Sequence, residues 1–248
     1  MLGSLKRFFS GQGFRPDLNA VADWARQAGH RYKRARDDEG FIVDGSLDGK
    51  PWRLEWGPSQ RSYITGHELR MRMELGLPSD AQWMLLSRPL MEVLEKQAFE
   101  LYTEVNQTQI DTASPEEVRW LVIHSKVNMS TLKTLRVGVA AVANVPSAGL
   151  AWIEGALAHQ FERALAGPLG AEAPFVMMTL RGRLYLRLAL AQPELAAITG
   201  TVKLFETAAV QAARLTSLSN GAAGDWPTTG SALWQSLQPT DSTHGGRS

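Results

Sequence analysis

Three arginines of this sequence have the side-chain type and the spacing of a binding site: Arg53, Arg70 and Arg72. Each lies in a segment where polar and apolar residues alternate strictly, so each falls on the polar face of an expected β-strand. Three further polar side chains are expected beside them at the strand ends, namely Arg61, Tyr63 and His67. Because the guanidinium fork matches carboxylate and phosphate groups, the pattern indicates a ligand-binding site for an anion.

The same face carries carboxylates that offer a structural explanation for these arginines. Glu55, Glu68 and Glu74 alternate along the same segments, and cross-strand pairs of opposite charge each contribute roughly 0.2–1 kcal/mol. The acids nearly match the bases in number. The sequence therefore favours a solvated, internally paired sheet face over a ligand site.

No other grouping of residues predicts a particular chemistry. The five histidines have no second ligand at a metal-binding interval, so we expect no metal site and no cofactor, and we expect His124 to be a half-buried packing residue. The adjacent Glu116 and Glu117 would point about 100° apart on a helix, and we interpret them as favourable charges in a first turn. Motifs of nucleophile elbows and dinucleotide-binding loops are missing. We therefore predict no catalytic residue, which favours a non-enzymatic protein without deciding the question.

The overall composition limits the partners. The 248 residues carry 26 Lys and Arg against 25 Asp and Glu, a formal net charge of +1, so no overall field attracts nucleic acid. The basic run at residues 31–36 is followed at once by acidic residues 37–39, and we interpret it as a solvated helix end leading into a turn. The chain has no cysteine, no apolar run long enough to span a membrane and no signal-peptide pattern, which predicts a cytoplasmic protein.

The elements that would position the arginines are best defined between Gly40 and Gly76. Alternation there predicts a three-stranded antiparallel meander, with tight reversals favoured at Asp44-Gly45 and at Asp48-Gly49. Leu69 to Leu75 is expected as a strand, because a helix would scatter its apolar side chains around the circumference. A helix capped by Asp17 precedes the meander, and a buried strand from Trp83 to Leu86 follows it.

Capping and turn residues predict the remaining elements. Ser87 is expected to cap a helix with Pro89 in its first turn, and Ser114-Pro115 with Glu117 to open another. The apolar stretch from Leu135 to Val142 fits a strand or a helix equally well. Further along we expect one helix from Ser147 to Gly167, a hairpin of residues 175–180 and 183–190 around Arg181-Gly182, and a final helix from Pro193.

These elements predict an α+β fold in which helices cover antiparallel sheets. Residues 15–215 would form the globular region, between a flexible N-terminus at residues 1–14 and a disordered tail at residues 216–248. The order helix, hairpin, helix recurs in residues 15–104 and 146–215, and Leu69 to Leu75 overlays Leu184 to Leu190 with Arg72 on Arg187. An internal duplication into two similar halves would explain this likeness, and chance resemblance of Leu-Arg strands is the alternative.

Two functional hypotheses follow. The first is a non-enzymatic adaptor or protein-binding protein, with Trp226 and Trp234 as partner-binding anchors in the tail and a homodimer as one option. The second is an enzyme or small-ligand binder that holds an anionic ligand on the arginine-bearing sheet face. Nucleic acid is not an expected partner, and membrane contact is limited to a weak peripheral contact through residues 1–9. The missing catalytic motifs favour the first hypothesis.

Overall fold

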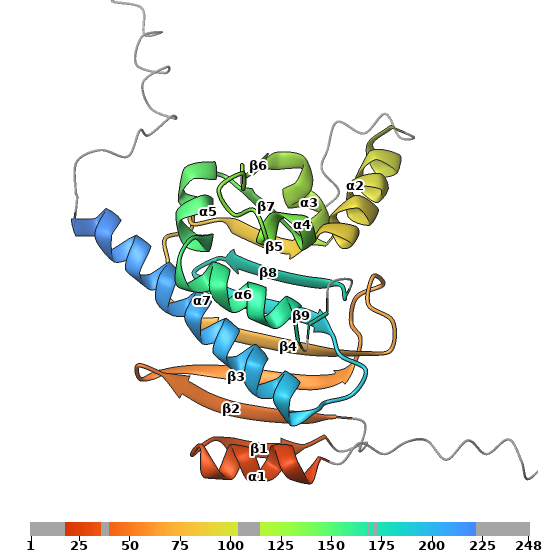
Figure 1. The fold of residues 1–248 in the computed structure, drawn as a ribbon, viewed down its shortest axis with the longest axis vertical. Coiled ribbons are helices and arrows are strands. Elements are labelled where there is room, and N and C mark those ends of the chain that lie inside the picture. The colour runs from red at the N-terminus through yellow and green to blue at the C-terminus, as the bar shows by residue number, and fades with distance from the viewer. Residues whose placement is uncertain (1–17, 36–39, 104–114, 168, 171–172, 222–248) are drawn as a thin grey trace, which may run out of the picture.

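One antiparallel sheet organises the chain. The computed structural model describes residues 18–35, 40–103, 115–167, 169–170 and 173–221. Within these residues nine strands pair in the order β1-β2-β3-β4-β9-β8-β5-β7-β6 (Figure 1). The strands are β1 (Arg31–Arg34), β2 (Phe41–Leu47), β3 (Lys50–Pro58), β4 (His67–Glu74), β5 (Trp83–Ser87), β6 (Ser125–Lys126), β7 (Val139–Ala143), β8 (Phe175–Leu180) and β9 (Arg183–Ala189). The helices are α1 (Asn19–Gln27), α2 (Arg88–Thr103), α3 (Glu116–Ile123), α4 (Leu135–Gly138), α5 (Pro146–Ile153), α6 (Ala156–Leu165) and α7 (Leu195–Gly221). The α+β class expected from the sequence is thus confirmed.

The apolar side chains of the alternating strands build the larger core on one face of the sheet. Strand β3 contributes Trp52, Leu54 and Trp56, all of which are buried. Helix α7 crosses this face diagonally, with α5 and α6 packed against it (Figure 1). The indole Nε1 of Trp52 donates a hydrogen bond to Glu206 of α7 at 3.1 Å, which attaches the helix to the sheet.

The opposite face of the sheet is only partly covered by described helices. Helices α2 and α3 form a smaller core with β5, β7 and β8, in which Met84, Leu86 and Val142 are buried. The outward side chains of β1 to β4 and of β9 are mostly charged and remain partly or fully exposed, apart from the buried Glu68. Half of this face is therefore available for contacts outside the described part of the chain.

The predicted meander is present as β2, β3 and β4. Leu54 pairs with Val43 of β2 and with Met71 of β4, so the three apolar rows align on one face. The predicted hairpin is also present, and it turns at Arg181 and Gly182 with φ of 51° and 78°. Positive φ at both central residues is what a two-residue reversal of type I′ requires.

Three local predictions are wrong. Asp44-Gly45 does not reverse the chain but lies inside β2, and the reversal uses Asp48-Gly49 alone. The basic run begins with the edge strand β1 and not with a helix end, because pairing with β2 overrides the local charge pattern. The expected helix from Ser147 to Gly167 is two helices, α5 and α6, separated at Gly155, whose φ of 73° does not fit a helix.

The helix starts also differ from the predicted caps. Ser87 does not cap α2, since its buried hydroxyl has no hydrogen-bond partner in the described part of the chain. Pro115 is the N-cap of α3 and not its first helical residue. The apolar stretch from Leu135 to Val142, for which the sequence allowed a strand or a helix, contains both. Helix α4 ends at Gly138, and β7 begins at Val139. The predicted caps Asp17 and Ser114 lie outside the described residues.

The division into two similar halves is not confirmed. Residues 146–215 contribute α5, α6, the β8–β9 hairpin and most of α7, whereas residues 15–104 contribute α1, β1 to β5 and α2. Helix α7 extends to Gly221, beyond the predicted start of the tail at residue 216. The rest of that tail, with Trp226 and Trp234, and the whole N-terminal segment 1–14 lie outside the described residues. A membrane-spanning helix is not found in the part of the chain that the structure describes.

Candidate anion-binding face

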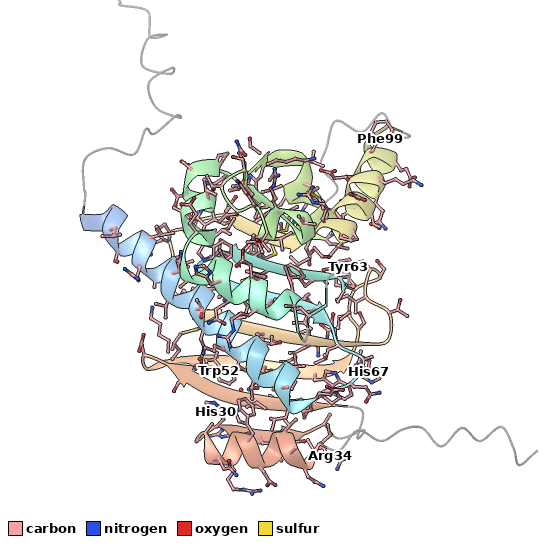
Figure 2. The ribbon with its side chains drawn as sticks, viewed as in Figure 1. His30, Arg34, Trp52, Tyr63, His67 and Phe99 are labelled. Atoms are coloured by element: carbon pink, nitrogen blue, oxygen red, sulfur yellow. The ribbon has the colours of Figure 1, made fainter. Side chains whose placement is uncertain are left out.

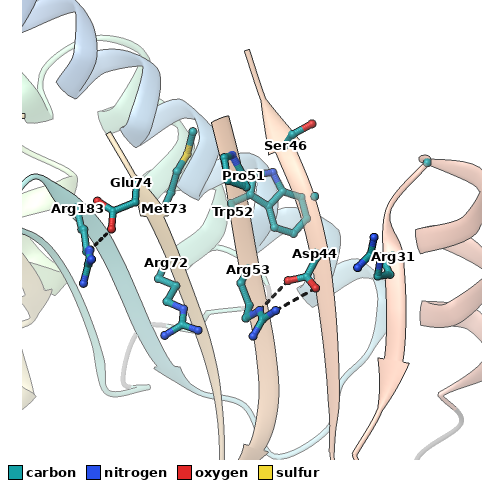
Figure 3. Close-up of a pocket in the computed structure, with 12 residues that line it drawn as sticks. Arg31, Asp44, Ser46, Pro51, Trp52, Arg53, Arg72, Met73, Glu74 and Arg183 are labelled. Carbon is teal, nitrogen blue, oxygen red and sulfur yellow. Dashed lines mark hydrogen bonds and ion pairs between the residues drawn. The ribbon is translucent and has the colours of Figure 1, made fainter. Parts of the chain in front are cut away.

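The uncovered part of the second sheet face, which we call the polar half-face, consists of the outward side chains of β1 to β4 and of β9. Its polar members are Arg31, Lys33, Asp44, Ser46, Arg53, Glu55, Glu68, Arg70, Arg72, Glu74, Arg183, Tyr185 and Arg187. Figure 3 shows one cross-strand row of this face, formed by Arg31, Asp44, Arg53 and Arg72. The row exists because side chains of one parity point to the same side of a pleated sheet.

The polar half-face is more basic than the chain as a whole. It carries seven cationic side chains against four carboxylates, although the formal net charge of the whole sequence is +1. The excess comes from the flanking strands, because β1 and β9 add cations to this face and no carboxylate. The near balance of acids and bases expected from the sequence holds for β3 and β4 alone.

Arg53 is held by a neighbouring carboxylate. Its Nε donates to Asp44 Oδ1 at 2.7 Å and its Nη2 donates to Asp44 Oδ2 at 3.2 Å. The hydrogen bond to Asp44 and the charge of that carboxylate raise the pKa of Arg53, so the guanidinium stays charged. This bidentate pair fixes the arginine between β2 and β3 (Figure 3).

A buried carboxylate organises two further arginines. Glu68 is 0% exposed, and its Oε1 accepts hydrogen bonds from Arg70 Nη1 at 2.9 Å and from Arg187 Nη1 at 2.8 Å. The backbone N–H of Gln60 donates to the same oxygen at 3.2 Å. Glu55 adds an ion pair with Arg70 at 3.3 Å. Glu68 thus joins β4, β9 and the β3–β4 loop at one point.

Two guanidinium groups have no strong partner among the described residues. The side chain of Arg72 is 58% exposed, and its one ion pair, with Glu55, spans 3.8 Å, which is too long for a hydrogen bond. Arg31 is exposed and forms neither an ion pair nor a hydrogen bond with its side chain inside the described ranges. The two residues lie on β1 and β4 in one row, so three strand spacings separate them by about 14 Å.

Two hollows open on the polar half-face. The larger has a volume of about 690 Å³, and its charged lining is Arg31, Asp44, Arg53, Arg72, Glu74 and Arg183 (Figure 3). The smaller has a volume of about 110 Å³, and its polar lining is Arg53, Glu55, Gln60, Arg70, Arg72, Tyr185 and Arg187. Arg53 and Arg72 border both hollows. Many of the residues that line both hollows are charged, whereas hydrophobic and aromatic side chains usually line small-molecule sites.

Arg61 and Tyr63 bind a second buried carboxylate instead of joining the three arginines. Glu117 of α3 is buried, and its Oε1 accepts hydrogen bonds from Arg61 Nε at 3.2 Å and from Tyr63 Oη at 2.9 Å. Burial and the nearby carboxylate raise the pKa of Tyr63, so the phenol stays protonated and donates. The three side chains attach the β3–β4 loop to α3, a role that the sequence interpretation of Glu117 as an ordinary first-turn charge missed.

His67 lies on the opposite face of the sheet from the arginines. Its ring stacks on Trp56 with centroids 4.6 Å apart and an interplanar angle of 12°. Figure 2 shows it near one end of the sheet. Residue 67 has the same parity as the apolar Leu69 and Met71, so the alternation itself assigns His67 to the helix-covered face. Of the six predicted ligand residues, the structure therefore brings together only the three arginines.

Two other titratable side chains are packing residues. His124 contacts Trp120 edge to face with ring centroids 5.0 Å apart, and burial lowers its pKa, which agrees with the packing role expected for it. Glu206 lies on the helix-covered side, where burial raises its pKa and Trp52 donates to it. His30 approaches Trp52 on the same side, with ring centroids 4.8 Å apart (Figure 2). None of these groups belongs to the polar half-face.

Arg187 is the site residue that sequence reasoning missed most clearly. Alternation along residues 183–190 already assigns it to a polar face, and its likeness to Arg72 is visible in the sequence. What the sequence pattern does not contain is the pairing of β9 with β4, which brings Arg187 opposite Arg70. The sequence pattern also does not identify Arg31, because it predicts a helix end for the basic run, whereas the run begins with β1.

The fold and this face define an α+β protein in which the described helices leave an arginine-rich half of one sheet face uncovered. Comparison with known proteins adds no relative, because no protein-family model, no curated protein and no solved structure matches the chain. The residues that the structure describes contain no group of three or more His, Asp or Glu side chains that could hold a metal ion. A functional assignment therefore depends on the geometry of the polar half-face.

Proposed function

We propose that this chain is a protein-binding protein that holds an acidic segment of a partner on its polar half-face. The observation that carries the proposal is the local excess of cations on a sheet face that described helices leave uncovered. Arg31 and Arg72 supply guanidinium groups without strong internal partners. Charge complementarity of this kind raises association rates and selects the partner.

The spacing of these two arginines favours an extended partner over a small anion. A single carboxylate or phosphate would contact both guanidinium groups only if the two side chains leaned toward each other over Arg53, because their strands lie about 14 Å apart. An extended peptide rises about 3.3 Å per residue, so roughly four residues would connect the two positions. The open outline of the face also suits a peptide or a protein surface.

The alternative hypothesis, an enzyme or small-ligand binder for an anionic ligand, rests on the larger hollow. Its volume of about 690 Å³ is in the range of small-molecule sites. However, Arg53 and Arg183 in its wall are already paired with Asp44 and Glu74. A small anion would have to compete with these carboxylates, which makes this alternative the weaker one.

A homodimer formed through the polar half-face is disfavoured by the same charges. Two copies facing each other would oppose two surfaces that each carry more cations than carboxylates. Like charges brought together across an interface cost several kcal/mol. A dimer, the option raised by the sequence, would have to use a different surface.

An internal duplication stays a hypothesis about origin. Its support is the seam between β4 and β9, where a twofold axis through the Met71–Leu186 pair would relate Arg72 to Arg187, as the overlay of the two segments requires. Superposing β3–β4 on β8–β9 by a half turn tests it. A poor fit of the outward side chains would leave chance resemblance as the explanation.

Fluorescence anisotropy with a labelled oligoglutamate peptide tests the proposed function. We expect the full chain to bind this peptide and to release it as salt is added, because salt screens exposed charges. The double variant Arg31→Gln/Arg72→Gln should bind about tenfold more weakly, since each exposed ion pair contributes up to about 1 kcal/mol.

The matched control is the double variant Arg26→Gln/Arg214→Gln. It removes the same charge from the exposed surfaces of α1 and α7, outside the polar half-face. Its affinity for the peptide should stay close to that of the unchanged chain. Equal losses in both double variants, or no binding by the unchanged chain, would contradict the proposal.

A further inference from the structure

The smaller hollow gathers four arginines in an arrangement that a sheet normally avoids. Arg53 lies directly opposite Arg72, and Arg70 lies directly opposite Arg187. Like charges at directly opposed positions destabilise a sheet, and here two such pairs are neighbours along β4. Local arrangements that reduce stability in this way are expected mainly at functional sites.

Carboxylates offset this repulsion only in part. The buried Glu68 forms ion pairs with both Arg70 and Arg187, so one carboxylate offsets the charge of two arginines. Glu55 lies 3.3 Å from the nearest nitrogen of Arg70 and 3.8 Å from that of Arg72. Its side chain is 26% exposed, so it can move aside. Glu55 therefore occupies the place that an incoming oxyanion would take between these two arginines.

Hydrogen-bond donors remain available around the hollow. Arg53 uses Nε and Nη2 on Asp44, and Arg187 uses Nη1 on Glu68, so each keeps further N–H groups that no described residue accepts. Arg72 donates no hydrogen bond to any residue of the described ranges. A tetrahedral oxyanion could accept from several of these guanidinium groups at once, and charge-assisted bonds of this kind are the strong ones.

The size of the hollow limits the ligand to one chemical group. Its volume of about 110 Å³ is well below the roughly 300–1,000 Å³ that is usual for small-molecule sites. That is enough for a single phosphate group with its oxygens. A nucleotide or a sugar phosphate would need a site several times larger.

We propose that this hollow binds a phosphate monoester group carried by a phosphorylated side chain of the acidic partner segment. The inference rests on the proposed function, since it names the group that the polar half-face selects within that segment. A phosphorylated side chain carries a charge of about −1.5 to −2 and three strong acceptor oxygens. Inorganic phosphate offers the same chemistry without a peptide, so the test includes it.

Binding of three probes to the full chain tests this proposal by anisotropy and calorimetry. The first is a short acidic peptide with one phosphoserine, the second is a glutamate peptide of equal net charge, and the third is inorganic phosphate alone. We expect the phosphopeptide to bind about tenfold more tightly than the charge-matched peptide, because only phosphate fills the hollow and uses several guanidinium forks. Arg72→Gln should abolish this preference.

Glu55→Gln gives a second and opposite prediction for the same site. Because the variant removes the internal competitor, it should bind the phosphopeptide several-fold more tightly than the unchanged chain. The charge-matched control Glu74→Gln removes a carboxylate of the same face that pairs with Arg183, outside the smaller hollow. It should gain less affinity for the phosphopeptide than Glu55→Gln does.

The outcomes separate this inference from the proposed function. Equal affinity for the two peptides would overturn the phosphate site and leave the binding of acidic segments intact. Binding of inorganic phosphate that depends on Arg72, without binding of either peptide, would contradict both the proposed function and a phosphorylated segment as the ligand, and would identify the hollow as a site for free phosphate. Weak binding of phosphate with tight binding of the phosphopeptide would identify a phosphorylated segment as the source. Loss of all three probes would contradict both.

Discussion

Glu68→Gln should lower the free energy of unfolding by about 3 kcal/mol, because it removes the buried carboxylate of an ion pair and, among the described residues, leaves Arg187 without a carboxylate and Arg70 with Glu55 alone. In this chain the effect falls on two arginines, since Arg70 and Arg187 face each other and share the Oε1 of Glu68. Urea unfolding followed by tryptophan fluorescence measures the change, and the chain has 8 tryptophans as reporters.

Two further variants show whether the effect comes from the uncompensated arginines. Glu74→Gln removes an exposed carboxylate on the same face of the same strand, and its unfolding curve should stay close to that of the unchanged chain. In Glu68→Gln/Arg187→Met one of the two opposed charges is gone, so part of the lost stability should return. A Glu68→Gln protein with unchanged stability would contradict the role assigned to this carboxylate.

Gly45→Ala should destabilise the protein by about 2 kcal/mol, within the range measured for overpacked cores. A Cβ at this position would fall 2.2 Å from the nearest atom of the Trp52 indole, well inside van der Waals contact. The indole cannot easily retreat, because it is 1% exposed and its Nε1 is bonded to Glu206 of α7. Urea unfolding gives the loss of stability, and a change in tryptophan emission would report the displaced ring.

Gly138→Ala is the matched control for this substitution. A Cβ at residue 138 would meet Leu165 at 3.8 Å, an ordinary contact, and Gly138 closes helix α4. Because alanine favours helix over glycine, this variant should be as stable as the unchanged chain or slightly more stable. If both substitutions changed the stability equally, the close approach of the Trp52 ring to β2 would not be the reason why residue 45 must be a glycine.

Much of the fold was predictable wherever one face of an element is buried. The alternation of Trp52, Leu54 and Trp56 with charged residues defines both the strand and its two faces, and the structure has them as predicted. Leucines also alternate with other residues from Leu184 to Leu190, which predicted strand β9 and with it the hairpin of β8 and β9. In each case the period of the apolar residues depends only on local geometry.

The errors arise where distant contacts override a local signal. Asp44-Gly45 has the residues of a reversal, yet Gly45 pairs with Trp52 of β3 as a strand residue, and its missing side chain leaves room for the Trp52 ring. The basic residues from Arg31 become an edge strand because β2 offers them hydrogen bonds. Neither reason is visible without knowing which strands are neighbours.

The candidate site shows the same limit. Sequence alternation correctly put Arg53, Arg70 and Arg72 on one face, while the parity of His67 already excluded it from that face. The contribution of Arg187 depends on a partner strand more than a hundred residues away in the chain, since Arg187 and Glu68 are 119 positions apart. Such long-range pairing determines the charge of the face, and local periodicity does not encode it.

Nuclear magnetic resonance can test most directly whether the polar half-face is the binding surface, by mapping where an acidic peptide binds. We predict that the chemical-shift changes on titration gather on β1, β3, β4 and β9, and that the Nε–H signal of Arg72 is among those that move most. Signals of α5, α6 and α7 on the covered face should stay in place. Changes confined to those helices, or to the exposed surface of α2 and α3, would contradict the central claim that the polar half-face is the binding surface.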